Sequence, residues 1–272
     1  MTLDKLMALA KELANEFSMP FSDYQFVLSH HLQQSIPQML LNRRQLIPDG
    51  LEQVLNHDFA KLNQGMPPQY VLGKAWFYGL ELLVTSAVLI PRPETEGLVE
   101  LVLARLHGQE QILDIGTGSG TIAIALKTNC PSANIDATEL SLDALAVAQT
   151  NADRLKVQIN FLHKDIWPGT AILYDWIVSN PPYISAEEMQ RLDSRVKDYE
   201  PVTALLGGID GLDYYRKILS QAKSHLKPSG TIALEHGAGQ QEAITHLANL
   251  QGWHNVQCFS DLAGLARYLF IK

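Results

Sequence analysis

The feature that most constrains this chain is an alternation of short apolar runs with helix-like segments, which begins after Gly108. The apolar runs have the length of buried parallel strands, and most segments between them repeat their apolar residues at the helical period. This alternation predicts an α/β fold, an open sheet with helices on both faces. The strand-like runs are residues 111–113, 134–138, 158–162, 176–179 and 231–234, and the clearest helix-like segments are residues 120–128, 141–155 and 212–226. Residues 256–259 and 267–271 could close the sheet as a final strand pair.

The first part of the chain has a different character. Apolar residues recur at helical spacing in four short stretches, which predicts a small helical bundle as a separate domain over residues 1–73. Three β-rich runs follow at residues 70–72, 76–78 and 82–84, separated by Gly73 and Gly79. We therefore expect a hairpin-like connector over residues 74–90 and the α/β domain over residues 91–272.

A glycine-rich loop follows the first strand of the α/β region and leads directly into a helix. Glycines at alternate positions let the backbone turn tightly and approach a ligand, and the helix N-terminus offers free N–H groups. Dehydrogenase loops hold a pyrophosphate with a different spacing, Gly-x-Gly-x-x-Gly. The acid that begins this loop, Asp114, would repel a pyrophosphate but suits a ligand with an ammonium group. The loop consists of Asp114, Ile115, Gly116, Thr117, Gly118, Ser119 and Gly120.

Acidic residues also follow the next two strands. Glu139 stands at the end of the second strand, where its two oxygens could accept hydrogen bonds from both hydroxyls of a ribose. Asp165 follows the third strand, where it could accept from an adenine amino group beside the apolar faces of Ile166 and Trp167. These acids suit S-adenosylmethionine, a cationic nucleoside. Each feature alone has a plainer interpretation: a turn with another use, an acid at a helix N-terminus, or core packing of Trp167.

The loop after the fourth strand, Asn180-Pro181-Pro182-Tyr183, is the most informative tetrapeptide of the chain. An amide or exocyclic amine nitrogen is a poor nucleophile because its lone pair is delocalised. The Asn180 side-chain oxygen and the Pro181 carbonyl could each accept one N–H of such a group and stabilise the charge that develops on nitrogen. Pro182 stiffens the backbone, and Tyr183 could stack on the planar substrate. The alternative is a simple proline-rich turn.

Composition narrows the class of partner. The formal net charge of −8 and the pI of about 5.6 weigh against a protein that grips duplex DNA. Cys130 and Cys258 have no metal-ligand spacing, and we expect no metal. No apolar segment approaches the roughly 20 residues of a membrane helix, and the N-terminus lacks a signal peptide's apolar stretch. We therefore expect a cytoplasmic protein without membrane contact.

With these motifs on hand, the sequence resembles the release-factor glutamine methyltransferases, the HemK/PrmC family, over nearly its whole length. The segments most particular to the family are Ile-Pro-Arg-Pro-Glu-Thr-Glu at residues 90–96 and Gly-Gly-Ile-Asp-Gly-Leu at residues 207–212. Asn-Pro-Pro-Tyr is shared with amino-methylating DNA enzymes. The resemblance implies a class I, Rossmann-like S-adenosylmethionine methyltransferase sheet of seven strands, and an N-terminal helical domain that helps dock the release factor.

The resemblance also implies a reaction and its residues. One methyl group passes to the side-chain nitrogen (N5) of the glutamine in the Gly-Gly-Gln loop of class-1 peptide chain release factors, with S-adenosylhomocysteine as product. By position, Gly116 to Gly120, Glu139, Trp167 and Asn180 match the family's cofactor contacts, and Asn180 to Tyr183 match its substrate-amide site. The family more often has Asp at the position of Glu139; the longer acid should still reach a ribose. Arg92 and Glu94 lie in a family segment near the pocket, and a salt-bridged structural loop is an equal interpretation of both.

Three other functions stay open on the sequence alone. An N6-adenine methyltransferase could use the same loop on a flipped base, although the acidic balance and the absence of an evident target-recognition domain count against it. A ribosomal-protein glutamine methyltransferase would share the chemistry. A non-catalytic adaptor would bind the nucleoside without turnover, and it would not need two convergent amide acceptors. We expect a monomer without a nucleic-acid target.

Overall fold

The computed structural model describes all 272 residues, and the chain divides into two compact units. One unit, here the helical unit, consists of Met1–Lys74 together with Asp193–Tyr199. The other, the α/β unit, consists of Ala75–Leu192 together with Glu200–Lys272. The helical unit therefore takes two separate stretches of the chain. No helix in either unit has the length and apolar character needed to cross a bilayer.

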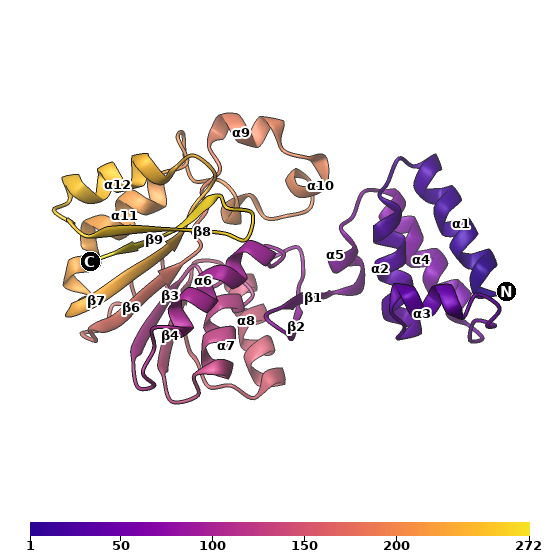
Figure 1. Ribbon diagram of the computed structural model, residues 1–272, viewed down its shortest axis with the longest axis horizontal. Coiled ribbons are helices and arrows are strands. Elements are labelled where there is room, and N and C mark those ends of the chain that lie inside the picture. Colours follow the sequence, from indigo (N-terminus) through magenta and orange to yellow (C-terminus); the bar gives the residue numbers. More distant parts are fainter. The chain divides into compact units, whose positions relative to one another are not determined.

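The helical unit buries one apolar face of each of its longer helices in a common core. The rings of Tyr24 and Phe59 meet edge to face at its centre, with centroids 5.1 Å apart. Ser35 begins the third helix with a capping box, in which its side chain accepts from the Gln38 N–H. The helices are α1 (Leu3–Glu16), α2 (Phe21–Leu32), α3 (Ile36–Leu41), α4 (Leu51–Asn63), α5 (Pro68–Leu72) and α10 (Ser194–Lys197), the first five in indigo to purple in Figure 1.

The β-rich interpretation of residues 70–72 is wrong, because these residues lie in α5. Pro68 occupies the start of that helix, where its fixed φ is already helical, and Gly73 ends it with a φ of 66°. The hairpin that follows is confirmed, with β1 (Lys74–Phe77) and β2 (Leu80–Leu83) as its strands. Tyr78 and Gly79 turn it with φ values of 50° and 76°, as a type I′ turn requires.

The second stretch of the helical unit is a short excursion that carries α10. Its first residue, Asp193, caps the helix by accepting from the Arg195 N–H at 2.8 Å. The Arg195 guanidinium bonds to the Asp23 carboxylate of α2. The Tyr199 hydroxyl donates to the Gln64 carbonyl just after α4, at 2.7 Å. These contacts make residues 193–199 part of the helical bundle.

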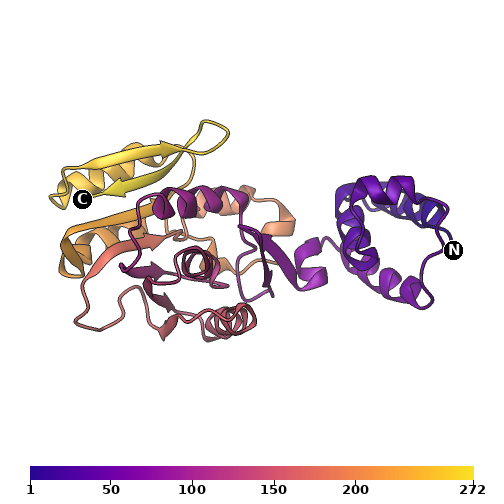
Figure 2. The same ribbon diagram turned by 60° about the horizontal axis from the view of Figure 1, so that its bottom comes forward.

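The α/β unit is built on a seven-stranded sheet in the order β5-β4-β3-β6-β7-β9-β8. The first five strands of that order are parallel, and the antiparallel pair β8–β9 closes one edge, as expected. Figure 2 shows this pair in yellow beside the rest of the sheet. The strands are β3 (Gln111–Ile115), β4 (Asn134–Glu139), β5 (Asn160–His163), β6 (Tyr174–Ser179), β7 (Leu226–Glu235), β8 (Val256–Ser260) and β9 (Ala266–Ile271).

Helices cover both faces of the sheet, which confirms the predicted α/β architecture (Figure 1). One apolar core joins the sheet to α6 and α7, and the other joins it to α11 and α12. The helices are α6 (Pro93–Leu103), α7 (Thr121–Asn129), α8 (Leu142–Leu155), α9 (Ala186–Arg191), α11 (Asp213–Gln221) and α12 (Gln241–Leu250), with 3-10 turns η1 (Val202–Ala204) and η2 (Ala222–Ser224). The helix expected over residues 212–226 ends earlier, because Leu226 already begins β7.

The strand order reverses direction between β3 and β6, and this reversal positions the site. The ends of three strands lie level there, since Ile115 pairs with Thr138 on one side and with Ser179 on the other. The Ser179 hydroxyl donates to the Ile115 carbonyl at 2.8 Å. Open α/β sheets bind ligands at such a switch point. The glycine-rich loop and the Asn180 loop therefore leave the sheet side by side.

Candidate active site

A cavity of about 280 Å³ opens at the carboxyl edge of the sheet, at the switch point. Its walls come from the loops after β3, β4, β5 and β6, with residues 87–89 and η1 also contributing. Two wider hollows, of about 550 and 750 Å³, have other walls and contain none of the predicted site residues. Of the predicted residues, those that line the cavity are Gly116, Gly118, Glu139, Asp165, Ile166, Asn180, Pro181 and Pro182.

The glycine-rich loop presents bare backbone to the cavity. Gly116 and Gly118 have φ values of 70° and 57°, and a Cβ added to either would meet no atom within 4 Å. Gly120 serves packing instead, because a Cβ there would lie 2.7 Å from Ile124 Cδ1. The first two glycines thus fit close approach of a ligand, and the third fits close packing behind the loop.

Asp114 lies behind this loop and does not line the cavity. It is fully buried, and its Oδ2 accepts from the Thr117 hydroxyl at 2.7 Å and from the Ala123 N–H at 3.2 Å. Burial raises the pKa of Asp114 to about 7, and its Oδ1 has no hydrogen-bond partner. Ser119 is buried in the same loop, with its hydroxyl 2.6 Å from that of Thr121. Asp114 therefore braces the loop, and its contact with a ligand's ammonium group stays a prediction.

Glu139 lines the cavity and also fixes two backbone segments beside it. One carboxylate oxygen accepts from the Gly118 N–H and the other from the Ser141 N–H, both at 2.9 Å. Ser141 caps α8, so the acid does stand at a helix N-terminus. A carboxylate oxygen has two lone pairs, and each oxygen of Glu139 keeps one for a ligand hydroxyl. The two interpretations of this residue are compatible.

The segment after β5 contributes one acid and one apolar wall. Asp165 is half exposed, with its Oδ2 3.9 Å from the Lys217 ammonium. Ile166 is buried at a φ of 62°, and its carbonyl accepts from the Thr138 hydroxyl. The Trp167 ring stacks on His225, 4.2 Å away, outside the lining of the cavity. The predicted cofactor contact of Trp167 stays a prediction.

The Asn-Pro-Pro-Tyr loop is tightly enclosed by neighbouring backbone. A Cβ on Gly207 would lie 2.6 Å from the Pro182 carbonyl oxygen, and one on Gly211 would collide with the Tyr183 carbonyl. The Gln240 amide donates to that Tyr183 carbonyl at 2.8 Å. The Gly-Gly-Ile-Asp-Gly-Leu segment thus lets one loop lie directly against the other.

Tyr183 itself is half-buried in the core beneath the loop and does not line the cavity. Burial raises the pKa of its hydroxyl, and the neighbouring Glu235 raises it further. Stacking of Tyr183 on a planar substrate therefore stays a prediction. Asn180, by contrast, lines the cavity, and its Nδ2 donates to the Thr95 hydroxyl at 3.0 Å.

Several residues that shape the site have no role that the sequence alone assigns. Asn151 is buried, and its side-chain amide accepts from the Leu83 N–H of β2 and donates to the Leu83 carbonyl. The same amide also donates to the Ser119 carbonyl of the glycine-rich loop. Thr95 and Glu235 are buried beside Asn180. Glu200 is buried as well. It accepts from the Arg92 guanidinium at 2.6 Å and from the Ile90 N–H, so Arg92 belongs to a salt-bridged structural loop.

Comparison with known proteins agrees with this geometry. The family model described as Methyltransferase small domain matches residues 94–195, and the one described as PrmC N-terminal domain matches residues 6–73. A methyltransferase structure from Pyrococcus furiosus shares the fold with a TM-score of 0.56, over 82% of this chain and 98% of that one, at 19% identity. The bare glycine loop and two cavity-lining acids fit a cationic nucleoside. The fold and the site define a methyltransferase that uses S-adenosylmethionine.

The sequence relatives narrow this class. The chain is similar to the release factor glutamine methyltransferase of Thermodesulfovibrio yellowstonii, with 34% identity over 99% of this chain and 97% of the relative. The corresponding protein of Clostridium acetobutylicum is 36% identical over 97% of this chain and 95% of the relative. That of Lactococcus lactis is 42% identical over 84% of this chain and 86% of the relative. The chain belongs to the release factor glutamine methyltransferase family.

Proposed function

We propose that this protein transfers one methyl group from S-adenosylmethionine to the side-chain amide nitrogen of the glutamine in the Gly-Gly-Gln motif of class-1 peptide chain release factors. The observation that carries the proposal is the orientation of Asn180 at the cavity. Its Nδ2 end is engaged with Thr95, so its Oδ1 is the end left for a substrate N–H. A planar amide that donates one N–H to Asn180 and one to the Pro181 carbonyl fits this wall.

The residues of the site act by positioning and by electrostatics. Two acceptors on the amide N–H groups increase the electron density on nitrogen and stabilise the positive charge that develops as it attacks. The rigid diproline keeps the two acceptors in register, because it removes two backbone donors and restricts φ. Alignment of the nitrogen with the reacting carbon supplies a further part of the rate.

The cofactor is held, in this proposal, by the loops after β3, β4 and β5. When bound, S-adenosylmethionine supplies an electrophilic methyl group and leaves as S-adenosylhomocysteine. Glu139 would accept from the ribose and Asp165 from the adenine, against Ile166. Gly116 and Gly118 would give the methionine part close access to the backbone, with Thr117, Ser119 and Gly120 holding the loop behind them. Asn180 would contact the cofactor from the opposite wall.

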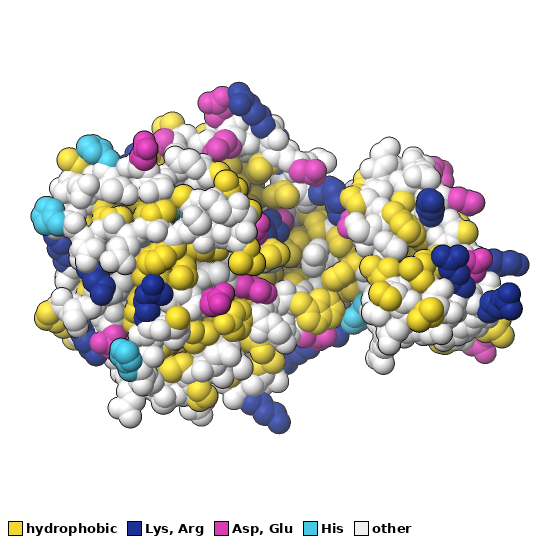
Figure 3. Space-filling view, in the orientation of Figure 1, with side chains coloured by type: hydrophobic (Ala, Val, Ile, Leu, Met, Phe, Trp, Pro, Cys, Tyr) yellow, Lys and Arg dark blue, Asp and Glu magenta, His cyan; other side chains and the backbone are white.

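The helical unit is the proposed docking surface for the protein substrate. Arg43 and Arg44 are exposed between the exposed Leu41 and Leu46. Figure 3 shows hydrophobic side chains in yellow and basic ones in dark blue next to one another on this unit. An apolar surface mixed with Arg suits recognition of a folded protein. We also propose that the protein acts in the cytoplasm, as a monomer and without a nucleic-acid target.

Mass spectrometry of a purified, unmethylated class-1 release factor tests the proposed function. After incubation with this protein and S-adenosylmethionine, we expect one added methyl on the Gly-Gly-Gln glutamine and none with Asn180→Ala. A release factor whose motif glutamine is replaced by alanine serves as the substrate control. Methylation of ribosomal proteins or of adenine in nucleic acid, with the release factor unmodified, would refute the proposed substrate and identify the alternative.

A further inference from the structure

We propose that Glu235 is a positioning residue for methyl transfer: with Thr95 it fixes the side-chain amide of Asn180 so that Oδ1 faces the substrate. This inference rests on the proposed function of Asn180. It concerns residues that lie behind the cavity wall, because neither Glu235 nor Thr95 lines the cavity.

The sheet brings these residues together. β6 and β7 are parallel, and Ser179 pairs with Leu234, so Asn180 and Glu235 follow level positions on neighbouring strands. Thr95 comes from the first turn of α6, and its side chain is buried. Glu235 is only 1% exposed. A buried carboxyl and a buried hydroxyl therefore lie behind the partly buried carboxamide of Asn180.

Hydrogen-bond donors and acceptors in this space determine the orientation of the amide. Asn180 Nδ2 donates to Thr95 Oγ1 at 3.0 Å, and the side chains of both residues interact with the Glu235 carboxyl and lower its pKa. An ionised carboxylate only accepts, so the Thr95 hydroxyl must donate to Glu235 and accept from Asn180. The Nδ2 end of Asn180 then faces only acceptors inside the protein. If the Asn180 side-chain amide flipped, its Oδ1 would face the ionised Glu235 carboxylate, which is repulsive.

The protonation state of Glu235 is therefore important. Burial raises its pKa to about 7, with Glu94 raising it further, while Arg267 and the bonds from Thr95 and Asn180 lower it. Its Oε2 has no hydrogen-bond partner. Protonation below this pKa turns the carboxyl into a donor as well, so that the reversed Asn180 amide becomes acceptable. The competent orientation is thus secured above neutral pH and loosened below it.

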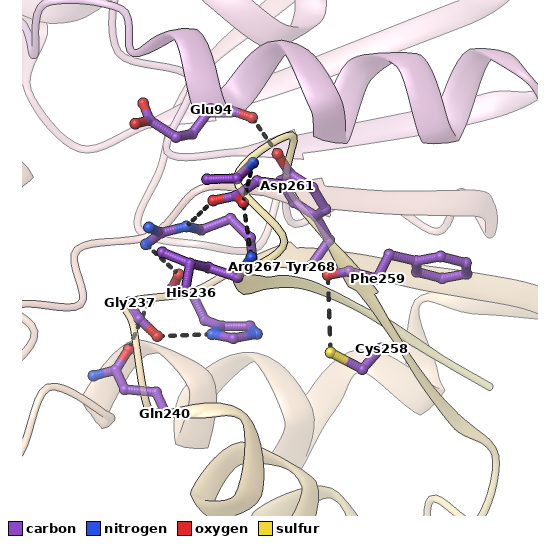
Figure 4. Close-up of polar contacts among 11 residues, drawn as sticks. Glu94, His236, Gly237, Gln240, Cys258, Phe259, Asp261, Arg267 and Tyr268 are labelled. Carbon is purple, nitrogen blue, oxygen red and sulfur yellow. Dashed lines mark hydrogen bonds and ion pairs between the residues drawn. The ribbon is translucent and has the colours of Figure 1, made fainter.

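No neighbouring group changes its charge beside Asn180 in the way that Glu235 does. The titratable and charged groups around Glu235 are Glu94 of α6, Tyr183, Tyr215 of α11, His236, and Arg267 and Tyr268 of β9. Figure 4 shows that the Tyr268 hydroxyl reaches the Glu94 carbonyl, and that Arg267 is held by Asp261 and the His236 carbonyl. Burial keeps the pKa of the tyrosines above 10 and lowers that of His236. Glu235 is the group whose charge changes beside Asn180 near pH 7.

Steady-state kinetics of matched variants give the first test. Thr95→Val removes the hydroxyl and keeps the shape, so we expect kcat to fall about 10-fold while the Kd for S-adenosylmethionine, by calorimetry, changes less than about 2-fold. Thr95→Ser restores the hydroxyl and should restore most of kcat. Tyr268→Phe, which removes a hydrogen bond from the same cluster without touching Asn180, should leave kcat within about 2-fold. An equal loss in Tyr268→Phe would overturn the proposal.

The pH profile gives the second test. Wild-type kcat should rise with pH through an apparent pKa of about 7 and level off above it. Glu235→Gln keeps an acceptor for Asn180 but cannot ionise, so this acid limb should disappear. An unchanged acid limb in Glu235→Gln would contradict the assignment.

Nuclear magnetic resonance tests the inference without any turnover. In the full-length protein labelled with ¹⁵N at asparagine, the side-chain signals of Asn180 are identified by their loss in Asn180→Ala. We expect them to shift between pH 5.5 and 8.5 with a midpoint near 7, and to lose this transition in Glu235→Gln. Signals that do not respond to pH in the wild type would overturn the inference. If they do respond but release factor is not methylated, the proposed function fails and the coupling between Glu235 and Asn180 stands.

Discussion

Two buried carboxyl groups, Asp114 and Glu235, stand at the same edge of the sheet and make an informative comparison. Burial raises the pKa of each to about 7, and each has one oxygen without a hydrogen-bond partner. They differ in where their partners come from. Asp114 is held by Thr117 of its own loop and by Ala123 in the first turn of α7, at most nine residues away. Glu235 is held by Thr95 and Asn180, from a helix and a loop far away in the sequence.

This difference separates two ways of building a site. The brace of Asp114 is local, because both of its partners lie within residues 114–123, although Glu139 and Asn151 also hold the loop from outside. The brace of Glu235 exists only after α6, β6 and β7 have packed together. We infer that substitutions on the Asp114 side affect cofactor binding and stability, whereas those on the Glu235 side affect catalysis. Four predictions test this division, from the largest expected effect to the smallest.

Asn180→Ala should have the largest effect. It removes an acceptor that acts on the developing charge, and such groups contribute about 10²- to 10³-fold to kcat. The Kd for S-adenosylmethionine should change by less than about 3-fold, because the loops after β3, β4 and β5 hold most of the ligand in our proposal. Methyl-transfer assays with radiolabelled cofactor measure kcat, and calorimetry measures the Kd for S-adenosylmethionine. Turnover at the wild-type rate would refute the role of Asn180.

The stability of the α/β unit should depend on pH through both carboxyl groups. Because their folded pKa values are raised, the folded state binds more protons than the unfolded one, so stability falls as pH rises toward about 7. Each group should contribute about 2–3 kcal/mol between pH 5 and pH 8. All four tryptophans lie in the α/β unit, so urea unfolding followed by their fluorescence reports on it.

Two isosteric variants complete that measurement. Asp114→Asn and Glu235→Gln should each remove one part of the pH dependence of stability, since neither amide ionises. Only Glu235→Gln should alter the pH profile of kcat. If Asp114→Asn also removed the acid limb of kcat, the proposed division between the two groups would be wrong.

Glu139→Ala should weaken cofactor binding by about 10-fold, which corresponds to about 1.4 kcal/mol. The substitution removes the proposed ribose acceptor and also the bonds to the Gly118 and Ser141 N–H groups. The value of kcat at saturating cofactor should change less than the affinity. Glu139→Gln retains one acceptor oxygen, so its cofactor affinity in a calorimetric titration should lie between that of the wild type and that of Glu139→Ala. Unaltered affinity would leave Glu139 with its structural role alone.

Thr117→Val should have the smallest effect. It removes one hydrogen bond to the buried Asp114 carboxyl, a loss of about 1 kcal/mol that should weaken cofactor binding a few-fold. Its kcat at saturation should equal that of the wild type, in contrast to Thr95→Val. Thr117→Ser is the matched control. Similar kcat losses in Thr117→Val and Thr95→Val would remove the distinction between the two braces.

The same contrast explains what the sequence could predict. The strand and helix alternation was readable because each element carries its own period, and both functional loops follow directly from strands. Asp114 stood in the loop it braces. Glu235 appeared only as the residue after an apolar run, and Thr95 as a helix residue in a family segment. Their meeting at Asn180 depends on the register of β6 with β7, which no local pattern encodes.

The one misassigned element has a similar cause. Residues 70–72 are Tyr-Val-Leu, a run with high strand propensity and too short to show a helical period. The flanking Pro68 and Gly73 decide the outcome, because one favours the first helical turn and the other provides a left-handed end. At this position the helix-starting proline and the helix-ending glycine outweigh the strand propensity of the residues between them.

The excursion that carries α10 limits how this protein can be recombined with its relatives. A chimaera that exchanges residues 1–74 alone would keep the original Arg195 and Tyr199, whose partners Asp23 and Gln64 lie in the exchanged part. Arg195 and Asp23 are both mostly buried, so an Arg195 left without its acid carries a substantial cost. Grafts that transfer residues 193–199 along with the N-terminal stretch preserve these pairings. The helical unit must therefore be transferred as two pieces, residues 1–74 and 193–199, although five of its six helices lie in the first piece.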